Sequence, residues 1–196
     1  MKPPNVTLDN MCIIDLEQNR KDASQIGRLI QMHHNNEISL RVVAASASEL
    51  KRDKKTHPSH FDEFKKRLAS TSLGQVRILP TLCYVGVSFV GHCLVGGGWL
   101  SKLEEEVQKV LFGEGETEYS DFCRKYGYDE KSKEEWNDWI RRKCDVLTLW
   151  SHMWYSGDIF VTRDNIFFKP TNRSKLIQLG VGKIMKPTDA VKLLDC

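Results

Sequence analysis

The stretch Asp158-Ile159-Phe160-Val161-Thr162-Arg163-Asp164 decides the fold, because it joins an apolar run to an acidic end. Ile159 to Thr162 are β-branched or aromatic and follow a Gly157-Asp158 turn, a pattern that predicts a short buried strand. In open α/β sheets, functional groups gather just outside the carboxyl ends of strands. Asp164 is therefore expected at such an edge, although this stretch alone favours an ordinary turn.

Strands and helices alternate on either side of this stretch. Strands are expected at 6–8, 38–43, 75–79, 159–162 and 183–185, and helices at 22–34, 58–68, 132–155 and 187–194. Asp22 with Gln25 and Ser132 with Glu135 have the spacing of capping boxes. The alternation predicts an α/β fold of three layers, with a central, mostly parallel sheet and helices on both faces.

The segment from about 81 to 128 is the least regular part of the chain. It contains one expected amphipathic helix, at about 100–111, and we interpret it as an irregular and helical insertion into a single domain spanning 1–196. The apolar stretch from Leu82 to Leu100 contains several glycines and His92. It is therefore predicted to be an internal glycine-rich segment and not a membrane span.

Bulk composition fits a globular protein, with 40% hydrophobic and 28% charged residues. A formal net charge of +3 permits a nucleic-acid partner without requiring one. The six cysteines include no Cys-x-x-Cys pair, which argues against a zinc ribbon, and the N-terminus does not read as a signal peptide. Reduced thiols in a cytoplasmic protein fit these features best.

Four acids fall at positions where this architecture could bring them together. Asp9 ends the first strand, Glu49 follows the second, Asp145 lies where the long helix becomes apolar, and Asp164 follows the strand after it. Converging carboxylates repel one another unless they share protons or a cation, and hard oxygen ligands select Mg²⁺ or Mn²⁺. Such ions promote phosphodiester hydrolysis. Four independent surface or capping acids would fit the same spacing.

These residues carry a resemblance to a known family. The chain resembles the PIN-domain family of metal-dependent ribonucleases, which includes the VapC-type toxins, at both ends and poorly in the middle. The similar stretches are Val6–Asp15, Ala45–Leu50, Asp145–Asp164 and Leu179–Pro187. The resemblance implies a PIN-like fold in which Asp9, Glu49, Asp145 and Asp164 are catalytic and bind Mg²⁺ or Mn²⁺. It implies an endoribonuclease with an RNA substrate and no membrane, and it allows a toxin-antitoxin role with an inhibitor protein, and a homodimer.

Two other functions remain open. The family usually has a small polar residue two positions after the first acid, where this chain has Met11, so a non-catalytic module that binds RNA or protein is an alternative. A phosphatase acting on a small phosphoester is a second alternative, but the Asp-x-Asp run expected after the first strand is absent.

Four polar residues near the acids are candidates for supporting roles. Asn10 could orient metal ligands or form a turn, and Thr162 could bind a carboxylate or phosphate through its hydroxyl. Arg163 is expected to pair with an acid before it contacts phosphate. His152 could position phosphate, but a helical histidine beside tryptophans is more often a hydrogen-bonded core residue.

Basic residues are candidates for contacts with nucleic acid. Lys51, Arg52, Arg141 and Arg142 could neutralise backbone phosphates. Runs of this kind, including Lys65-Lys66-Arg67, are usually solvated faces of the protein.

Overall fold

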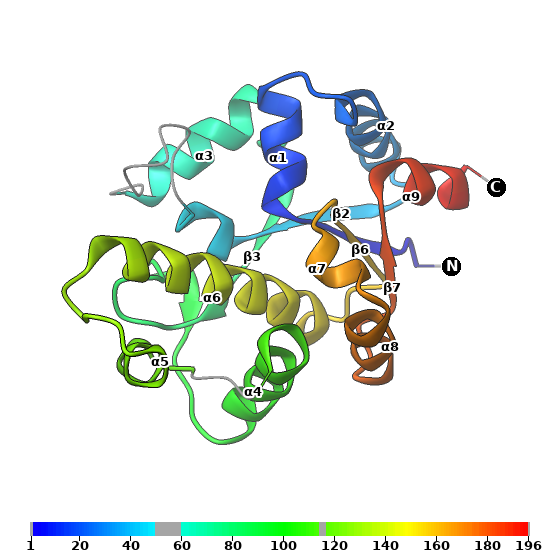
Figure 1. Ribbon diagram of the computed structural model, residues 1–196. Coiled ribbons are helices and arrows are strands. Elements are labelled where there is room, and N and C mark those ends of the chain that lie inside the picture. Colours follow the sequence, from blue (N-terminus) through cyan, green and yellow to red (C-terminus); the bar gives the residue numbers. More distant parts are fainter. Residues whose placement is uncertain (1, 50–59, 114–116, 196) are drawn as a thin grey trace.

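A computed structural model describes residues 2–49, 60–113 and 117–195, and its centre is a sheet of five parallel strands (Figure 1). In spatial order the strands are β3 (Arg77–Leu79), β2 (Ser39–Val43), β1 (Asn5–Leu8), β6 (Ile159–Val161) and β7 (Lys183–Met185). Every neighbouring pair in this sheet is parallel. The predicted α/β class is therefore confirmed.

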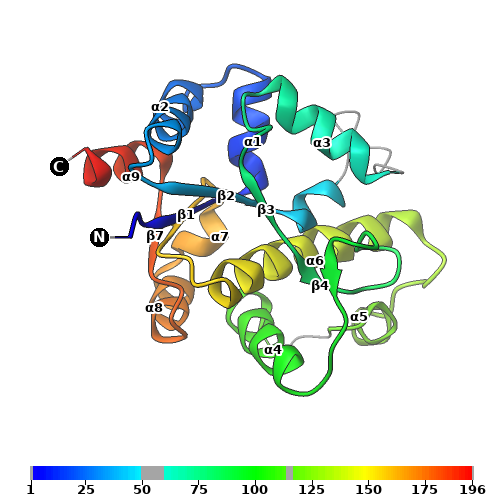
Figure 2. The same cartoon turned by 180° about the vertical axis from the view of Figure 1, so that it is seen from behind.

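Helices cover both faces of the sheet, which gives three layers (Figures 1 and 2). One face carries α1 (Asn10–Glu17), α2 (Ala23–His34), α3 (Phe61–Ser70) and α9 (Pro187–Leu194). The other carries α4 (Trp99–Phe112), α6 (Lys133–Trp154) and α8 (Pro170–Gln178). Two short elements follow strands directly: the 3-10 helix η1 (Ala44–Ala47) after β2, and α7 (Asn165–Phe168) near the end of β6.

Side chains that alternate along a strand pack into the hydrophobic cores on the two faces of the sheet. In β6, Ile159 and Val161 pack into the core that contains α1 and α2, whereas Phe160 packs on the opposite side with residues of α6 and α8. All three side chains are buried, as expected for parallel strands covered on both faces.

The expected element boundaries are close to the observed ones, but the predicted capping boxes are wrong. Asp22 and Ser132 do occupy the N-cap positions of α2 and α6, yet neither side chain makes a capping hydrogen bond. Spacing identified where these helices begin and did not identify how their first N–H groups are satisfied.

The segment at 81–128 lies on the α6 side of the sheet (Figure 2). It contains the expected helix, α4, and also α5 (Tyr119–Tyr126) and a small parallel pair of strands, β4 (Thr81–Leu82) and β5 (Cys93–Leu94), which the sequence did not predict. Within the described ranges, no helix is long and apolar enough to cross a membrane.

The strand order locates a crevice. Along the chain, β2 and β3 are added on one side of β1, and β6 and β7 on the other. The connections leave β1 and β6 in opposite directions, so the space outside their carboxyl ends is the place where open α/β sheets bind ligands.

Candidate functional site

Asp9 occupies the crevice directly after β1. It is the N-cap of α1, and its Oδ1 accepts a 2.7 Å hydrogen bond from the N–H of Asn10. The Thr162 hydroxyl, from the end of β6, donates a 2.6 Å bond to Asp9 Oδ2. Asp9 is only 4% exposed, so its carboxylate is almost removed from solvent.

Asp164 lies across the crevice at the end of β6. Its Oδ1 accepts a 2.9 Å bond from the N–H of Ile166, which makes it the N-cap of α7. Its own N–H donates to the Thr162 hydroxyl at 3.0 Å. Asp164 is therefore both a turn residue and a member of the site, because the single hydroxyl of Thr162 joins it to Asp9.

Glu49 enters from the segment after η1 and is bound by Asn10. The Asn10 Nδ2 donates a 2.5 Å hydrogen bond to Glu49 Oε2, and its Oδ1 accepts from the Arg67 guanidinium at 3.0 Å. Arg67 is itself fixed by two bonds to Glu17, at 2.5 and 2.9 Å. We call this series, Glu17, Arg67, Asn10 and Glu49, the Glu49 relay.

Asp145 approaches from α6, and the charges of the four acids affect one another. Burial raises the pKa of Asp9 to about 6 and, with the charge of Asp9 as the second cause, raises that of Glu49 to about 8. The pKa of Asp145 is also raised, by burial and then by the charges of Asp9, Glu49 and Asp164. The fold has therefore gathered the four predicted acids into one electrostatic unit.

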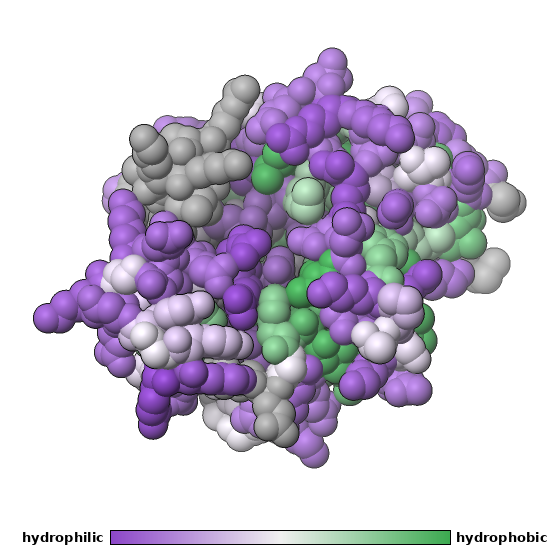
Figure 3. Space-filling view, viewed as in Figure 1, coloured by the Kyte–Doolittle hydropathy of each residue, from purple (hydrophilic) through white to green (hydrophobic). Residues whose placement is uncertain are grey.

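A cleft of about 540 Å³ opens beside this unit. Asp145 and Asp164 line it together with the basic side chains of Arg141, Arg142 and Lys169. Figure 3 shows that this face of the molecule is mostly hydrophilic, with an apolar area between α4 and α8. Carboxylates and cations thus share one open surface, a combination that suits a phosphorylated ligand.

The fit to a divalent cation is partial. The donor set is the one that Mg²⁺ and Mn²⁺ prefer, and the mutual repulsion of the acids would be relieved by a cation. Among the described residues, however, no three His, Cys, Asp or Glu side chains are arranged to hold a metal ion. Both oxygens of Asp9 already accept hydrogen bonds, so this carboxylate would have to share its lone pairs or turn.

Two predicted neighbours of the site lie elsewhere. His152 follows Asp145 by two helical turns, about 10 Å along the axis, so it lies over the sheet and not at its edge. It is fully buried, with Nε2 donating to the carbonyl of Val181 at 2.8 Å and Nδ1 2.8 Å from the Thr7 hydroxyl. This is the core role that the sequence favoured.

Arg163 also turns away from the four acids. Successive side chains of an extended chain alternate, so Arg163 points opposite to Thr162 and Asp164. It pairs with Asp15, at 2.5 and 2.6 Å, and lies 3.5 Å from Asp22. The expected ion pair exists, but with acids of the α1–α2 region.

The basic candidates divide into three groups. Lys51 and Arg52 lie outside the described residues. Arg141 is largely exposed and contacts Asp138 at 2.6 Å, whereas Arg142 is held by the same acid. Arg142 also lies over three aromatic rings, those of Phe112, Phe122 and Tyr126. Arg142 is therefore mainly a residue that packs against the aromatic side chains of α4 and α5.

Sequence reasoning missed two residues near the acids. Arg67 was grouped with a solvated basic run, although its place on the amphipathic helix α3 brings it to Asn10. Lys169 precedes Pro170 at the start of α8, and no local pattern marks it, because only the tertiary fold places it beside Asp145.

Comparison with known proteins adds no further constraint: no family model, no curated protein and no solved structure matches the chain.

Proposed function

We propose that this protein is a metal-dependent nuclease of the PIN-like kind, an endoribonuclease that hydrolyses phosphodiester bonds. The observation that carries the proposal is the electrostatic coupling of Asp9, Glu49, Asp145 and Asp164 at the switch point of a parallel sheet. Buried like charges are costly, so a fold that gathers four of them requires a compensating cation or shared protons.

The four acids would hold Mg²⁺ or Mn²⁺, which, when bound, acts as a Lewis acid and lowers the pKa of water. The protein's own side chains supply the positioning. The Thr162 hydroxyl fixes Asp9 relative to Asp164. Asn10 holds Glu49 through its side chain and Asp9 through its backbone N–H. Metal binding would still require the acids to move closer together, because no three of the described His, Cys, Asp or Glu side chains are arranged to hold a metal ion.

Substrate binding is assigned to the cleft beside the acids. Arg141 and Lys169 flank Asp145 and Asp164, so a polyanionic strand could lie along the cleft with a phosphate next to the carboxylates. The preference for RNA, a toxin-antitoxin role with an inhibitor protein, a homodimer and a cytoplasmic location rest on the family resemblance and on composition.

The test is a cleavage assay on a mixture of RNA and single-stranded DNA, with Mn²⁺ or with EDTA. Wild-type protein should cleave RNA only with the metal, and Asp145→Asn should lower turnover by orders of magnitude while the fold is retained. Asp189→Asn is the matched control, since Asp189 is an exposed acid of α9 that receives the same substitution. Equal activity of both variants would refute the assignment of Asp145.

Substrate affinity is tested separately from turnover. Arg141→Ala combined with Lys169→Ala should weaken RNA binding and flatten its dependence on salt, while turnover at saturating RNA is largely kept. Loss of turnover without loss of affinity would contradict the assignment of the cleft.

A non-catalytic module that binds RNA is the second candidate. The observation in its favour is that no three of the described acids are arranged as metal ligands. If purified protein cleaves no nucleic acid with any divalent ion, and Asp145→Asn binds RNA as well as wild type, this second function replaces the first.

A further inference from the structure

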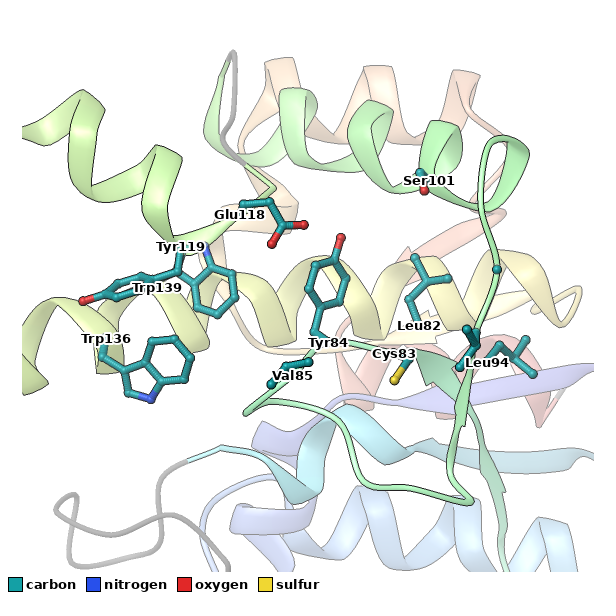
Figure 4. A pocket seen from close by; sticks show the side chains of 12 residues that line it. Leu82, Cys83, Tyr84, Val85, Leu94, Ser101, Glu118, Tyr119, Trp136 and Trp139 are labelled. Carbon is teal, nitrogen blue, oxygen red and sulfur yellow. The ribbon is translucent and has the colours of Figure 1, made fainter. Parts of the chain in front are cut away.

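A second pocket, of about 440 Å³, lies between α6, which contributes Trp136 and Trp139, and the segments that carry Tyr84 and Tyr119 (Figure 4). Helical spacing separates the two sites, because Trp136 and Trp139 project from the side of α6 that packs on the insertion. Tyr84, Tyr119, Trp136, Trp139 and Glu118 are among its lining residues. The pocket is therefore built by α6 and the segment at 81–128, not by the acidic crevice.

Three of its aromatic rings contact one another and form a wall. Tyr119 lies edge-on to Trp136 with centroids 4.8 Å apart, Trp136 stacks on Trp139 at 5.2 Å, and Tyr119 lies 5.5 Å from Trp139. Gly86 packs against the wall from the β4–β5 connection, where a Cβ atom would meet the ring of Trp136 at 3.1 Å. The rings are thus fixed before any ligand binds, which lowers the entropic cost of binding.

The electrostatics of the pocket select against anions. Among the described side chains that line it, Glu118 is charged and none is basic. Glu118 is exposed, and its charge contributes to raising the pKa of Tyr84, after burial and the effects of Glu104. A phosphate or an RNA backbone would be repelled here, in contrast to the cleft that contains Arg141 and Lys169.

The protein already places one ammonium group against two aromatic rings that line the pocket, those of Tyr84 and Trp139. The Nζ of Lys143 lies 3.7 Å from the ring centroid of Tyr84 and 5.5 Å from that of Trp139. This internal cation is paired with Glu104 at 2.5 Å, and the charge of Glu118 also acts on it from a greater distance. Glu118 itself is an exposed lining residue of the pocket, so its carboxylate can also meet a ligand. The pocket also suits the alkyl groups of a ligand. Two of its lining residues, Val85 and Val95, are apolar and are 96% and 88% exposed.

We propose that this pocket binds an organic ammonium cation, with its alkyl groups against Val85 and Val95, the charge near Glu118, and the aromatic wall as the cation–π surface. The site is independent of the proposed nuclease function. Its ligand is either a free alkylammonium compound or the alkylammonium side chain of a partner protein, and the two share this chemistry.

The test uses choline and its neutral isostere neohexanol. Binding is followed by the NMR signals of the tryptophan indole N–H groups in the full-length protein. Choline should shift the signals of Trp136 and Trp139, but not those of the remaining three tryptophans, and neohexanol should shift them much less. Equal shifts with both compounds, or no shift with choline, would overturn the proposal.

Two charge-matched variants locate the cation. Glu118→Gln should weaken choline binding by roughly fivefold or more, while Glu130→Gln, at an exposed position outside the lining, should leave it unchanged. Undiminished binding in Glu118→Gln would refute the site. Both variants change an exposed side chain, so a folding failure does not obscure the result.

The source of the cation is decided by competition. A peptide in which a lysine is flanked by valines is compared with the same peptide carrying norleucine in its place. Displacement of choline by the lysine peptide alone assigns the pocket to a partner's side chain, and displacement by neither peptide assigns it to a free small cation. Equal displacement by both peptides would mean that charge is not recognised and would contradict the proposal.

Discussion

Replacing Asp9 by asparagine should stabilise the metal-free protein at neutral pH. Asp9 is buried, and the rise of its pKa from an ordinary 3.8 to about 6 corresponds to about 3 kcal/mol of destabilisation once both folded and unfolded states are ionised. Asparagine removes this cost. The charge-assisted bond from Thr162 needs no separate correction, because it lowers the pKa of Asp9 and is already contained in the value of about 6.

The gain from Asp9→Asn is therefore about 3 kcal/mol, or a rise in Tm of about 6–12 °C for a chain of this size. The sign depends on pH. Folding raises the pKa of the Asp9 carboxyl, so the wild-type protein is most stable at pH values below the unfolded-state pKa, where the group is protonated in both states. This stability is lost as the pH rises through about 6, the pKa in the folded state. The gain should hence be present at about pH 7.5 and nearly absent at about pH 4.

The assay is urea unfolding in EDTA at both pH values, with Asp189→Asn as the matched control. The difference between variant and wild type is diagnostic, because groups that do not interact with Asp9 cancel in it. Glu49 and Asp145 do not cancel, since the charge of Asp9 raises the pKa of each, and their relief adds to the gain at neutral pH. Addition of Mn²⁺ should then raise the Tm of wild type more than that of Asp9→Asn, through binding linkage. A destabilised Asp9→Asn protein at neutral pH, or a gain independent of pH, would refute the crowding of charge on which the proposed function depends.

Three further predictions follow from polar side chains and their partners. Lys143→Met should destabilise the protein by about 3–5 kcal/mol in chemical denaturation, because Glu104 is left buried without a partner, and adding Glu104→Gln should recover much of the loss; no recovery would contradict this reason. His152 is neutral in the folded protein at neutral pH, because burial lowers its pKa to about 4. Its contribution to the stability of the fold is therefore complete above pH 6.5. That contribution decreases as the pH falls, by about 3 kcal/mol at low pH. The stability advantage of wild type over His152→Gln should shrink accordingly between neutral pH and about pH 4, and a constant difference would disprove it. Arg67→Ala should weaken Mn²⁺ binding, measured by calorimetry, about as much as Asn10→Ala does, and the double variant should add little, since both act through one relay.

The sequence predicted the sheet because its signals are local. Ile159 to Val161 and Lys183 to Met185 are short apolar or mixed runs between turn residues, and each forms a strand at the expected place. The sequence could suggest that Asp9 and Asp164 lie near each other for the same reason, since Asp9 directly follows β1, Asp164 comes three residues after β6, and the carboxyl ends of these strands meet. Strand order itself, which makes the crevice, involves contacts between distant segments and has no local signal.

The supporting residues were harder to predict because their partners are remote in sequence. Arg67 reaches Asn10 across 57 positions, and Thr162 reaches Asp9 across 153. Arg163 was expected to face the acids, but alternation beyond β6 turns it to Asp15. A single position of offset along an extended chain thus decides whether a polar residue joins the site or leaves it.

The buried ion pair of Lys143 on α6 and Glu104 on α4 affects how these two helices align with each other. Apolar contacts between α4 and α6 alone would discriminate weakly between neighbouring alignments of the two helices. A slip by one helical turn, about 5.4 Å, would separate the two charges and leave each in a non-polar environment, at a cost of several kcal/mol. The pair therefore makes the docking of α4 selective for one alignment and disfavours partly docked intermediates.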